Sequence, residues 1–205
     1  MSELYIRRAI ETAINGLAGM NAITSSSVAT STVITTTSAH GLTSGMQVSI
    51  IGHTGSTPAI DGSYVVTVIG ASTFTIPKTV TVAGTGGGFT LTAWQNIPFT
   101  QPAANTPWQQ VWIPSSDAEN PTMGDNFYRI HSYFQIDLMY PLLKGTAAID
   151  TRIGIIKSTF KRGESFTNGG ITVKIENTPN VVDYGPDGNF YKKCIKVRYW
   201  ADIFP

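Results

Sequence analysis

The amino-acid sequence predicts an α+β protein: a host domain with two helices and a mixed or antiparallel sheet, plus an inserted all-β domain, a small barrel or sandwich. Three observations lead to this prediction. Two segments repeat apolar residues every three or four positions, as an amphipathic helix does. Many other segments are short, β-branched or alternating, and are bounded by glycines. The composition also changes sharply between Thr24 and Thr92.

This central stretch, residues 24–92, contains 17 threonines and only two charged side chains, Asp61 and Lys78. The sequences on both sides of it carry ordinary mixed charge. Such a shift indicates a second module within a host. We therefore divide the chain into a discontinuous host domain, residues 1–22 and 93–205, and an inserted β-domain, residues 24–92.

The chain is expected to begin with a helix near Ser2 that ends around Gly16 to Gly19. The apolar positions of this segment share one helical face, and they are Ile6, Ala9, Ile10, Ala13, Ile14 and Leu17. An apolar stripe requires a partner surface, so we expect this helix to pack on the C-terminal part of the chain.

Short strands separated by glycine turns are expected in the insert, because β-branched side chains favour a pleated surface. They cover Thr32–Thr37, Met46–Ile50, Tyr64–Val68, Thr73–Ile76 and Thr79–Val82. The glycine run Gly84–Gly88 is interpreted as a flexible return to the host.

The remaining sequence predicts strands, a long polar loop from Ser115 to Asn126, and a second helix between Gly145 and Gly163. The apolar positions of that helix are Ile149, Ile153, Ile156 and Phe160. The strands are expected at Trp94–Phe99, Trp108–Pro114, Tyr128–Leu138, Ile171–Ile175 and Tyr191–Tyr199.

Charge and hydropathy exclude several classes of partner. With 14 basic and 13 acidic residues the formal net charge is +1, so no global field attracts nucleic acid or an anionic membrane. No apolar run approaches the roughly 18 residues of a membrane span, and the N-terminus lacks the pattern of a signal peptide. We expect a soluble protein made in the cytoplasm, without a membrane or specific nucleic-acid partner.

No motif predicts an enzyme, a cofactor or a metal site. His40 and His53 lie in expected turns without a third ligand. Asp117, Glu119 and Asp125 share one loop but lack the bidentate glutamate of a calcium loop. The glycine run lacks the Lys-Ser/Thr of a phosphate loop. Polar turns and a solvated loop are the simpler interpretations.

Two further features have a structural and a functional interpretation. Cys194, the single cysteine, alternates as a strand residue, but the lysines beside it could lower its pKa and make it reactive. Lys157, Lys161 and Arg162 cluster at the end of the second helix, where they complement the helix dipole. A nucleic-acid patch is the alternative for this cluster.

The insert resembles a small β-barrel that is common in bacteriophage structural proteins and is similar to the first catalytic cysteine half-domain fold of ubiquitin-activating enzymes. The resemblance rests on His40-Gly41-Leu42, on Asp61-Gly62-Ser63-Tyr64 and on Thr73-Phe74-Thr75, in that order. The resemblance implies no catalytic residues.

The host resembles the phage tail terminator family, the lambda gpU-like or tail-completion proteins. The segments that carry the resemblance are the first helix, Trp94–Thr100, Trp112-Ile113-Pro114, Tyr140-Pro141, Phe160–Gly163 and the last strands. Family turns before the second helix are often rich in glycine, whereas here the turn reads Pro141-Leu142-Leu143-Lys144-Gly145.

This resemblance implies a non-enzymatic virion protein of the tail or neck, a hexameric ring that caps the tail tube. Its expected partners are copies of itself, the tail tube protein and the head–tail connector or neck proteins. The residues expected at its interfaces are Asp117, Glu119, Asp125, Lys161 and Arg162. A charge content of only 13% suits a surface buried against neighbours. The alternatives are another neck or tail-tube protein, or a module that binds host glycan through Tyr64 or Phe74.

Overall fold

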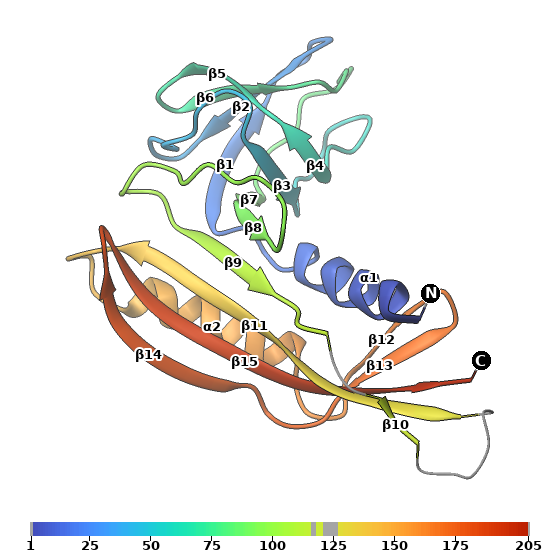
Figure 1. Cartoon of the computed structure of the whole chain (residues 1–205). Helices are drawn as coiled ribbons and strands as arrows, with labels where there is room; N and C mark the ends of the chain where they lie inside the picture. The colour runs from blue at the N-terminus through green and yellow to red at the C-terminus, as the bar shows by residue number, and fades with distance from the viewer. Residues whose placement is uncertain (1, 116–117, 121–126, 205) are drawn as a thin grey trace.

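The computed structural model of the chain describes residues 2–115, 118–120 and 127–204, and these form two helices and two curled sheets (Figure 1). The α+β class predicted from the sequence is consistent with this architecture. The seven-stranded sheet lies above the first helix in Figure 1, and the eight-stranded sheet lies below it.

The seven-stranded sheet is antiparallel throughout, in the order β4-β3-β7-β1-β2-β6-β5. Its strands are β1 (Asn21–Ser26), β2 (Thr32–Thr36), β3 (Gln47–Ile51), β4 (Gly62–Val65), β5 (Thr67–Gly70), β6 (Thr73–Ile76) and β7 (Gly88–Thr90).

The eight-stranded sheet has the order β12-β13-β15-β11-β9-β8, with β10 paired to β11 and β14 paired to β15. Only β8 and β9 run parallel among the described strands. Its strands are β8 (Thr92–Trp94), β9 (Trp108–Trp112), β10 (Ala118–Glu119), β11 (Tyr128–Pro141), β12 (Ser165–Asn168), β13 (Ile171–Ile175), β14 (Asn180–Asp187) and β15 (Phe190–Ile203).

Strands β11 and β15 are the central pair of this sheet. They pair without interruption from Tyr128 opposite Ile203 to Pro141 opposite Phe190. Alternation of side chains along both strands sends one set of residues toward the helices and the other set to the opposite face. The long strand predicted at Tyr128–Leu138 is therefore confirmed, and it runs three residues further.

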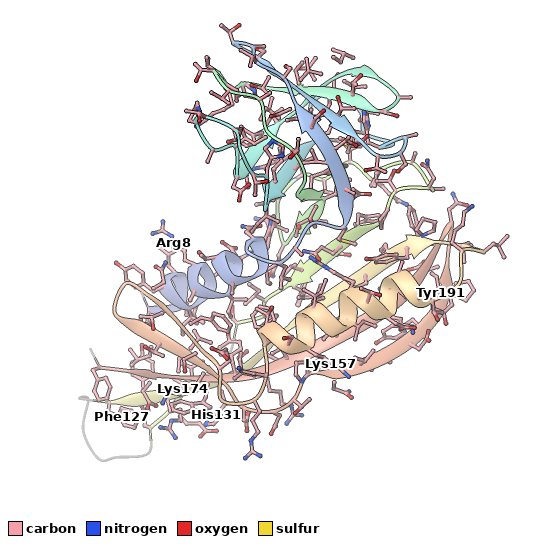
Figure 2. All side chains as sticks on the ribbon, turned by 180° about the vertical axis from the view of Figure 1, so that it is seen from behind. Arg8, Phe127, His131, Lys157, Lys174 and Tyr191 are labelled. Carbon is pink, nitrogen blue, oxygen red and sulfur yellow. The ribbon has the colours of Figure 1, made fainter. Side chains whose placement is uncertain are left out.

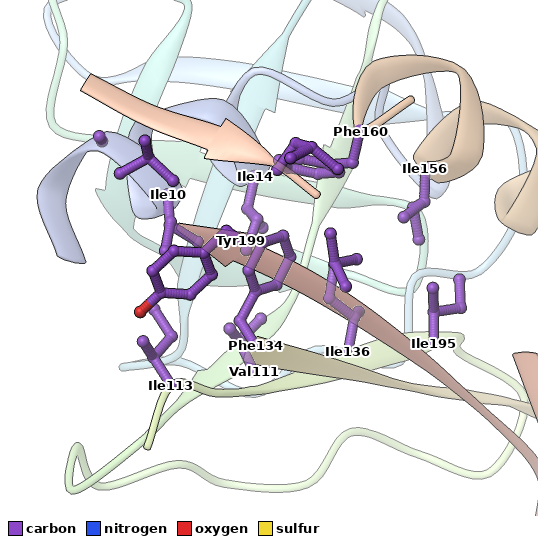
Figure 3. Packing of buried hydrophobic residues seen from close by; sticks show 14 of the residues in the cluster. Ile10, Ile14, Val111, Ile113, Phe134, Ile136, Ile156, Phe160, Ile195 and Tyr199 are labelled. Carbon is purple, nitrogen blue, oxygen red and sulfur yellow. The ribbon is translucent and has the colours of Figure 1, made fainter. Parts of the chain in front are cut away.

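The main core lies between this sheet and the helices α1 (Ser2–Asn15) and α2 (Ala147–Thr159) (Figure 3). Ile10 and Ile14 of α1 and Ile156 of α2 are fully buried there. The Phe134 ring of β11 meets the Phe160 ring edge-on at 5.0 Å, a favourable aromatic geometry. The prediction that the first helix packs on the C-terminal part of the chain is confirmed.

A second core fills the seven-stranded sheet and continues into the other one. Phe74 and Phe89 are fully buried within it. The same cluster includes four residues of the eight-stranded sheet, namely Ala93, Trp108, Met139 and Phe190. The side of that sheet that faces the smaller one is therefore apolar at one end. The assignment of residues 24–92 to a separate domain stays a prediction.

Several strands differ from the prediction. Strands β1, β7, β12 and β14 carry polar or glycine-rich sequences, and their pairing comes from neighbouring strands rather than from an apolar pattern. The stretch expected as Thr79–Val82 makes isolated bridges only, such as Ala29 with Val80. The strand expected at Trp94–Phe99 stops at Trp94, because Asn96 turns the chain with φ of 60°.

The glycine run 84–88 is part of the fold, which corrects its interpretation as a flexible return. The Ser26 amide donates to the Gly84 carbonyl at 2.9 Å, and the Ile23 amide donates to the Gly87 carbonyl at 3.1 Å. A Cβ on Gly87 would lie 2.6 Å from the His53 nitrogen. At Gly84, Gly87 and Gly88 a side chain would meet the backbone of a neighbouring segment, so only glycine fits at these positions.

Replacing Gly87 by alanine is expected to destabilise the protein more than the same change at Gly86. Both residues have positive φ, 76° and 74°, so both variants carry a backbone strain of about 1 kcal/mol. Only at Gly87 does the added carbon also meet backbone, whereas nothing lies within 4 Å of the Gly86 position. This overpacking lowers the free energy of unfolding by a further ~1–3 kcal/mol. Urea denaturation of the two variants measures the difference, and equal midpoints would contradict it.

Candidate functional site

The face of the eight-stranded sheet that points away from the helices carries aromatic and basic side chains. We call it the open face. Its members alternate along the strands with buried core residues, and they include Trp112, Arg129, His131, Tyr133, Lys174, Lys192, Lys196, Arg198 and Trp200. Figure 2 shows His131 and Lys174 near one end of this sheet. The side chains of His131, Lys174, Arg198 and Trp112 are exposed.

One end of the open face is built around Trp200. The Arg129 guanidinium lies 4.3 Å from the centre of the Trp200 ring, and the Lys174 ammonium lies 5.1 Å from it. Arg129 also donates two hydrogen bonds to Asp202, at 2.6 and 2.8 Å. This bidentate pair raises the pKa of Arg129 and lowers the pKa of Asp202. The tryptophan therefore sits among cations of fixed position.

The middle and far end of the open face follow the same pattern. The Lys196 ammonium lies 3.7 Å from the centre of the Tyr133 ring. Lys192 pairs with Asp137 at 3.0 Å and lies 5.5 Å from the Tyr184 ring centre. Long basic side chains are thus held in place before any partner arrives, and this preorganisation reduces the entropy lost on binding.

A buried arginine joins α2 to the segment before β1 and to the eight-stranded sheet. Arg152 of α2 donates hydrogen bonds to the Ala18 carbonyl and, at 2.8 Å, to the side-chain oxygen of Gln109. The Gln109 side chain donates to Thr92 at 3.1 Å. Burial lowers the pKa of Arg152 to about 10, and Tyr140 partly offsets this effect. The guanidinium stays charged at neutral pH and holds structure rather than substrate.

The interface residues expected from the sequence are not gathered in one place. Glu119 lies on β10, 4.0 Å from His131, so it borders the open face. Lys161 pairs with Glu164 at 3.3 Å beyond the end of α2, and Arg162 is exposed beside it. Asp117 and Asp125 lie outside the described residues. Their role at an interface stays a prediction, as does that of the other three.

The two histidines of the expected turns are buried rather than available. The rings of His40 and His53 are only 3% and 6% exposed. His53 lies within hydrogen-bond distance of the Gly86 carbonyl, at 2.7 Å, and of the Ser26 hydroxyl, at 2.9 Å. No group of three metal-binding side chains occurs in the part of the chain that the structure describes.

Cys194 is a buried strand residue, as its alternation predicted. Burial, together with the charge of Asp137 and a hydrogen bond to it, raises the pKa of the thiol to about 12. The neighbouring lysines act in the opposite direction but are outweighed. The hypothesis of a thiol activated by lysine is therefore wrong.

The described geometry offers an exposed surface of aromatic and basic side chains rather than a catalytic cleft. Trp, Tyr and Arg, which the open face presents, are the residue types enriched at protein interfaces. The model of the family described as phage tail terminator protein matches residues 88–199, more than half of the chain. The chain belongs to this family, and the resemblance of the host domain to tail terminators is confirmed, whereas the resemblance of residues 24–92 to a phage β-barrel stays a prediction. It is therefore a structural protein of the phage tail, since this family is of a structural, non-enzymatic kind.

Other comparisons add little. No curated protein matches the chain significantly. One solved structure, which carries only a sequence identifier as its name, is 20% identical and covers 56% of this chain and 80% of its own, with a TM-score of 0.43. That likeness is too small to support an argument. No helix among the described residues is long and apolar enough to cross a membrane.

The open face was missed by the sequence analysis, although one signal pointed to it. The alternation in Tyr128–Leu138 leaves Arg129, His131 and Tyr133 on the side opposite Ile130 and Phe134. The residues opposite them on β15 are Asp202, Trp200 and Arg198, which follow 65 to 73 positions later in the chain.

Cys194 is expected to resist alkylation by iodoacetamide in the native protein at pH 8 and to react fully in denaturant. With a thiol pKa near 12, the nucleophilic thiolate is scarce at that pH, and burial keeps the reagent away. Mass spectrometry of the intact chain measures the added group. Rapid alkylation without denaturant would contradict the burial of this residue.

Replacing Arg152 by alanine is expected to lower the free energy of unfolding by about 1–3 kcal/mol, because the buried Gln109 side chain and the Ala18 carbonyl lose their donor. Arg162→Ala, an exposed arginine beyond the same helix, is the control and should change little. Chemical denaturation compares them, and equal stability of the two variants would show that the Arg152 network does not hold the fold.

Proposed function

We propose that this protein terminates the phage tail: copies of the chain close into a ring, a hexamer, that caps the tail tube and joins it to the head connector. Membership of the tail terminator family is the observation that carries the proposal. A ring of identical subunits uses two different patches of each subunit in head-to-tail contacts. The chain would act in the virion, at the tail or neck.

The open face supports an assembly role. It presents Trp112, Tyr133 and Trp200 among basic side chains that are already held by carboxylates and rings. Aromatic and arginine side chains supply most of the energy of typical interfaces. In the proposed assembly this face contacts the tube or connector protein, while other surfaces join the copies.

We also propose that the protein has no catalytic activity. The thiol of Cys194 is held in its protonated state by its raised pKa. His40 and His53 are buried and bonded to backbone or to Ser26, not to a nucleophile at a surface. These groups support the fold.

One of the two residues named for the glycan-binding alternative is inaccessible. Phe74 is fully buried between the Phe89 ring and the His40 ring, each 5.5 Å away, so it is not available to a sugar. Tyr64 is partly exposed on β4. We propose instead that the seven-stranded sheet is a decorating domain of the ring.

Native mass spectrometry and negative-stain electron microscopy of the purified chain test the ring. We expect a hexamer of the 22.0 kDa chain with a central opening. A different closed ring would change the copy number only. A monomer at about 10 µM, far above the Kd of a stable assembly, would contradict the proposal.

Reversing the charge of Arg198, in the middle of the open face, is expected to reduce head–tail joining at least tenfold, while the ring and its stability persist. Complementation of a phage that lacks the gene measures infectious particles, and electron microscopy counts headless tails. Lys157→Glu, on the exposed side of α2, is the control. Arg162→Glu tests the competing helix-end site, and a defect there with a normal Arg198→Glu variant would move the interface to α2.

A further inference from the structure

The turn between β11 and α2 carries a fully exposed leucine, Leu143, at the tip of the molecule. Its backbone has φ of 61°, a conformation that is uncommon for a residue with a branched side chain. Such strain persists only where the surrounding structure imposes it, and it often marks a functional position. Lys144 follows it directly and makes no ion pair with any residue that the structure describes.

A pocket of about 220 Å³ lies at the other end of the molecule, between the start of α1 and the sheet. Apolar side chains form about half of its lining, and they include Leu4, Ile6, Ile113, Ile130 and Tyr199. Leu4 itself is 47% exposed, so part of this apolar wall faces water. The space is several times the ~30 Å³ of a water molecule and accommodates a leucine side chain.

Two charged residues, Glu3 and Arg7, border the pocket. The Arg7 guanidinium is already paired with the Glu11 carboxylate at 2.7 Å. Within the described part of the chain, Glu3 makes no ion pair. A pocket with apolar residues beside an unpaired carboxylate is complementary to an exposed leucine that is followed by a lysine.

The two features cannot meet within one chain. In Figure 1 the N-terminus, where α1 begins, and the turn after β11 lie at opposite ends of the eight-stranded sheet. Figure 2 shows the same separation, since Tyr191, the cross-strand partner of Tyr140, lies far from Arg8 of α1. The complementary surfaces therefore belong to two copies.

We propose that Leu143 of one subunit enters the α1 pocket of the next subunit, with Lys144 paired to Glu3 of that neighbour. This deepens the proposed ring, on which it rests, by naming the contact between copies. Because knob and pocket are different patches at opposite ends, each subunit offers one of each, and repetition of the contact adds subunits in one direction.

Charge reversal tests the pairing. Lys144→Glu and Glu3→Lys are each expected to raise the apparent Kd of the ring about tenfold or more, and the double variant is expected to recover most of the loss. Leu143→Ser should weaken the ring at least as strongly. Ile69→Ser, which removes another exposed apolar side chain, from β5, is the control. Sedimentation velocity measures assembly, and circular dichroism verifies that each variant is folded.

Cysteine cross-linking provides an independent readout. Leu143→Cys combined with Leu4→Cys should give a ladder of covalent oligomers under mild oxidation, which a reductant dissolves, while Leu143→Cys with Ile69→Cys should give none. The buried Cys194 does not compete. Rings that assemble normally in the Leu143 and Lys144 variants, without cross-links, would overturn the inference alone. A wild-type filament that depends on Leu143 would instead retain the contact and contradict the closed ring.

Discussion

Arg152 ties together the places where the chain passes between the two sheets. Its guanidinium holds the Ala18 carbonyl, just before β1, and the side chain of Gln109, whose backbone amide donates to Leu91 between β7 and β8. Both crossings of the chain are thereby fixed to α2 and to the eight-stranded sheet. The third nitrogen of the guanidinium, Nε, is buried without a hydrogen-bond partner among the described residues, so part of the cost of burying this charge is not offset. The contacts of Arg152 and the apolar cluster that includes Trp108, Met139 and Phe190 together hold the smaller sheet to the larger one.

Much of the fold could be predicted from local patterns. The spacing of Ile6, Ile10 and Ile14 located the first helix, and Ile149, Ile153 and Ile156 located the second, because each stripe has one buried side. Strands with alternating or β-branched residues were found for the same reason. Strands β1, β7 and β14 could not be predicted this way, because buried residues such as Ile23 and Phe89 stand alone among polar or small neighbours and form no alternating pattern.

The surfaces were harder to predict than the core. Arg129 and Trp200 stand 71 positions apart in the sequence, and only the pairing of β11 with β15 brings them together. Arg152 resembles any exposed cation of an amphipathic helix, and its burial depends on Gln109 from another element. Long-range register therefore decides which polar residues form a surface and which hold the interior. The composition did predict a role in assembly, because a chain with so few charges suits contact with neighbouring subunits.

The second core has a consequence for which part of the larger sheet is accessible. Met20 donates to the Phe89 carbonyl at 3.0 Å, so the segments that enter and leave the smaller sheet lie side by side. Trp108, Met139 and Phe190 of the larger sheet pack against the apolar core of the smaller one. Without the smaller sheet these three side chains would form an apolar patch in contact with water, and such patches promote association. The smaller sheet thus acts as a cover for one end of the larger sheet and leaves the charged remainder of that side accessible.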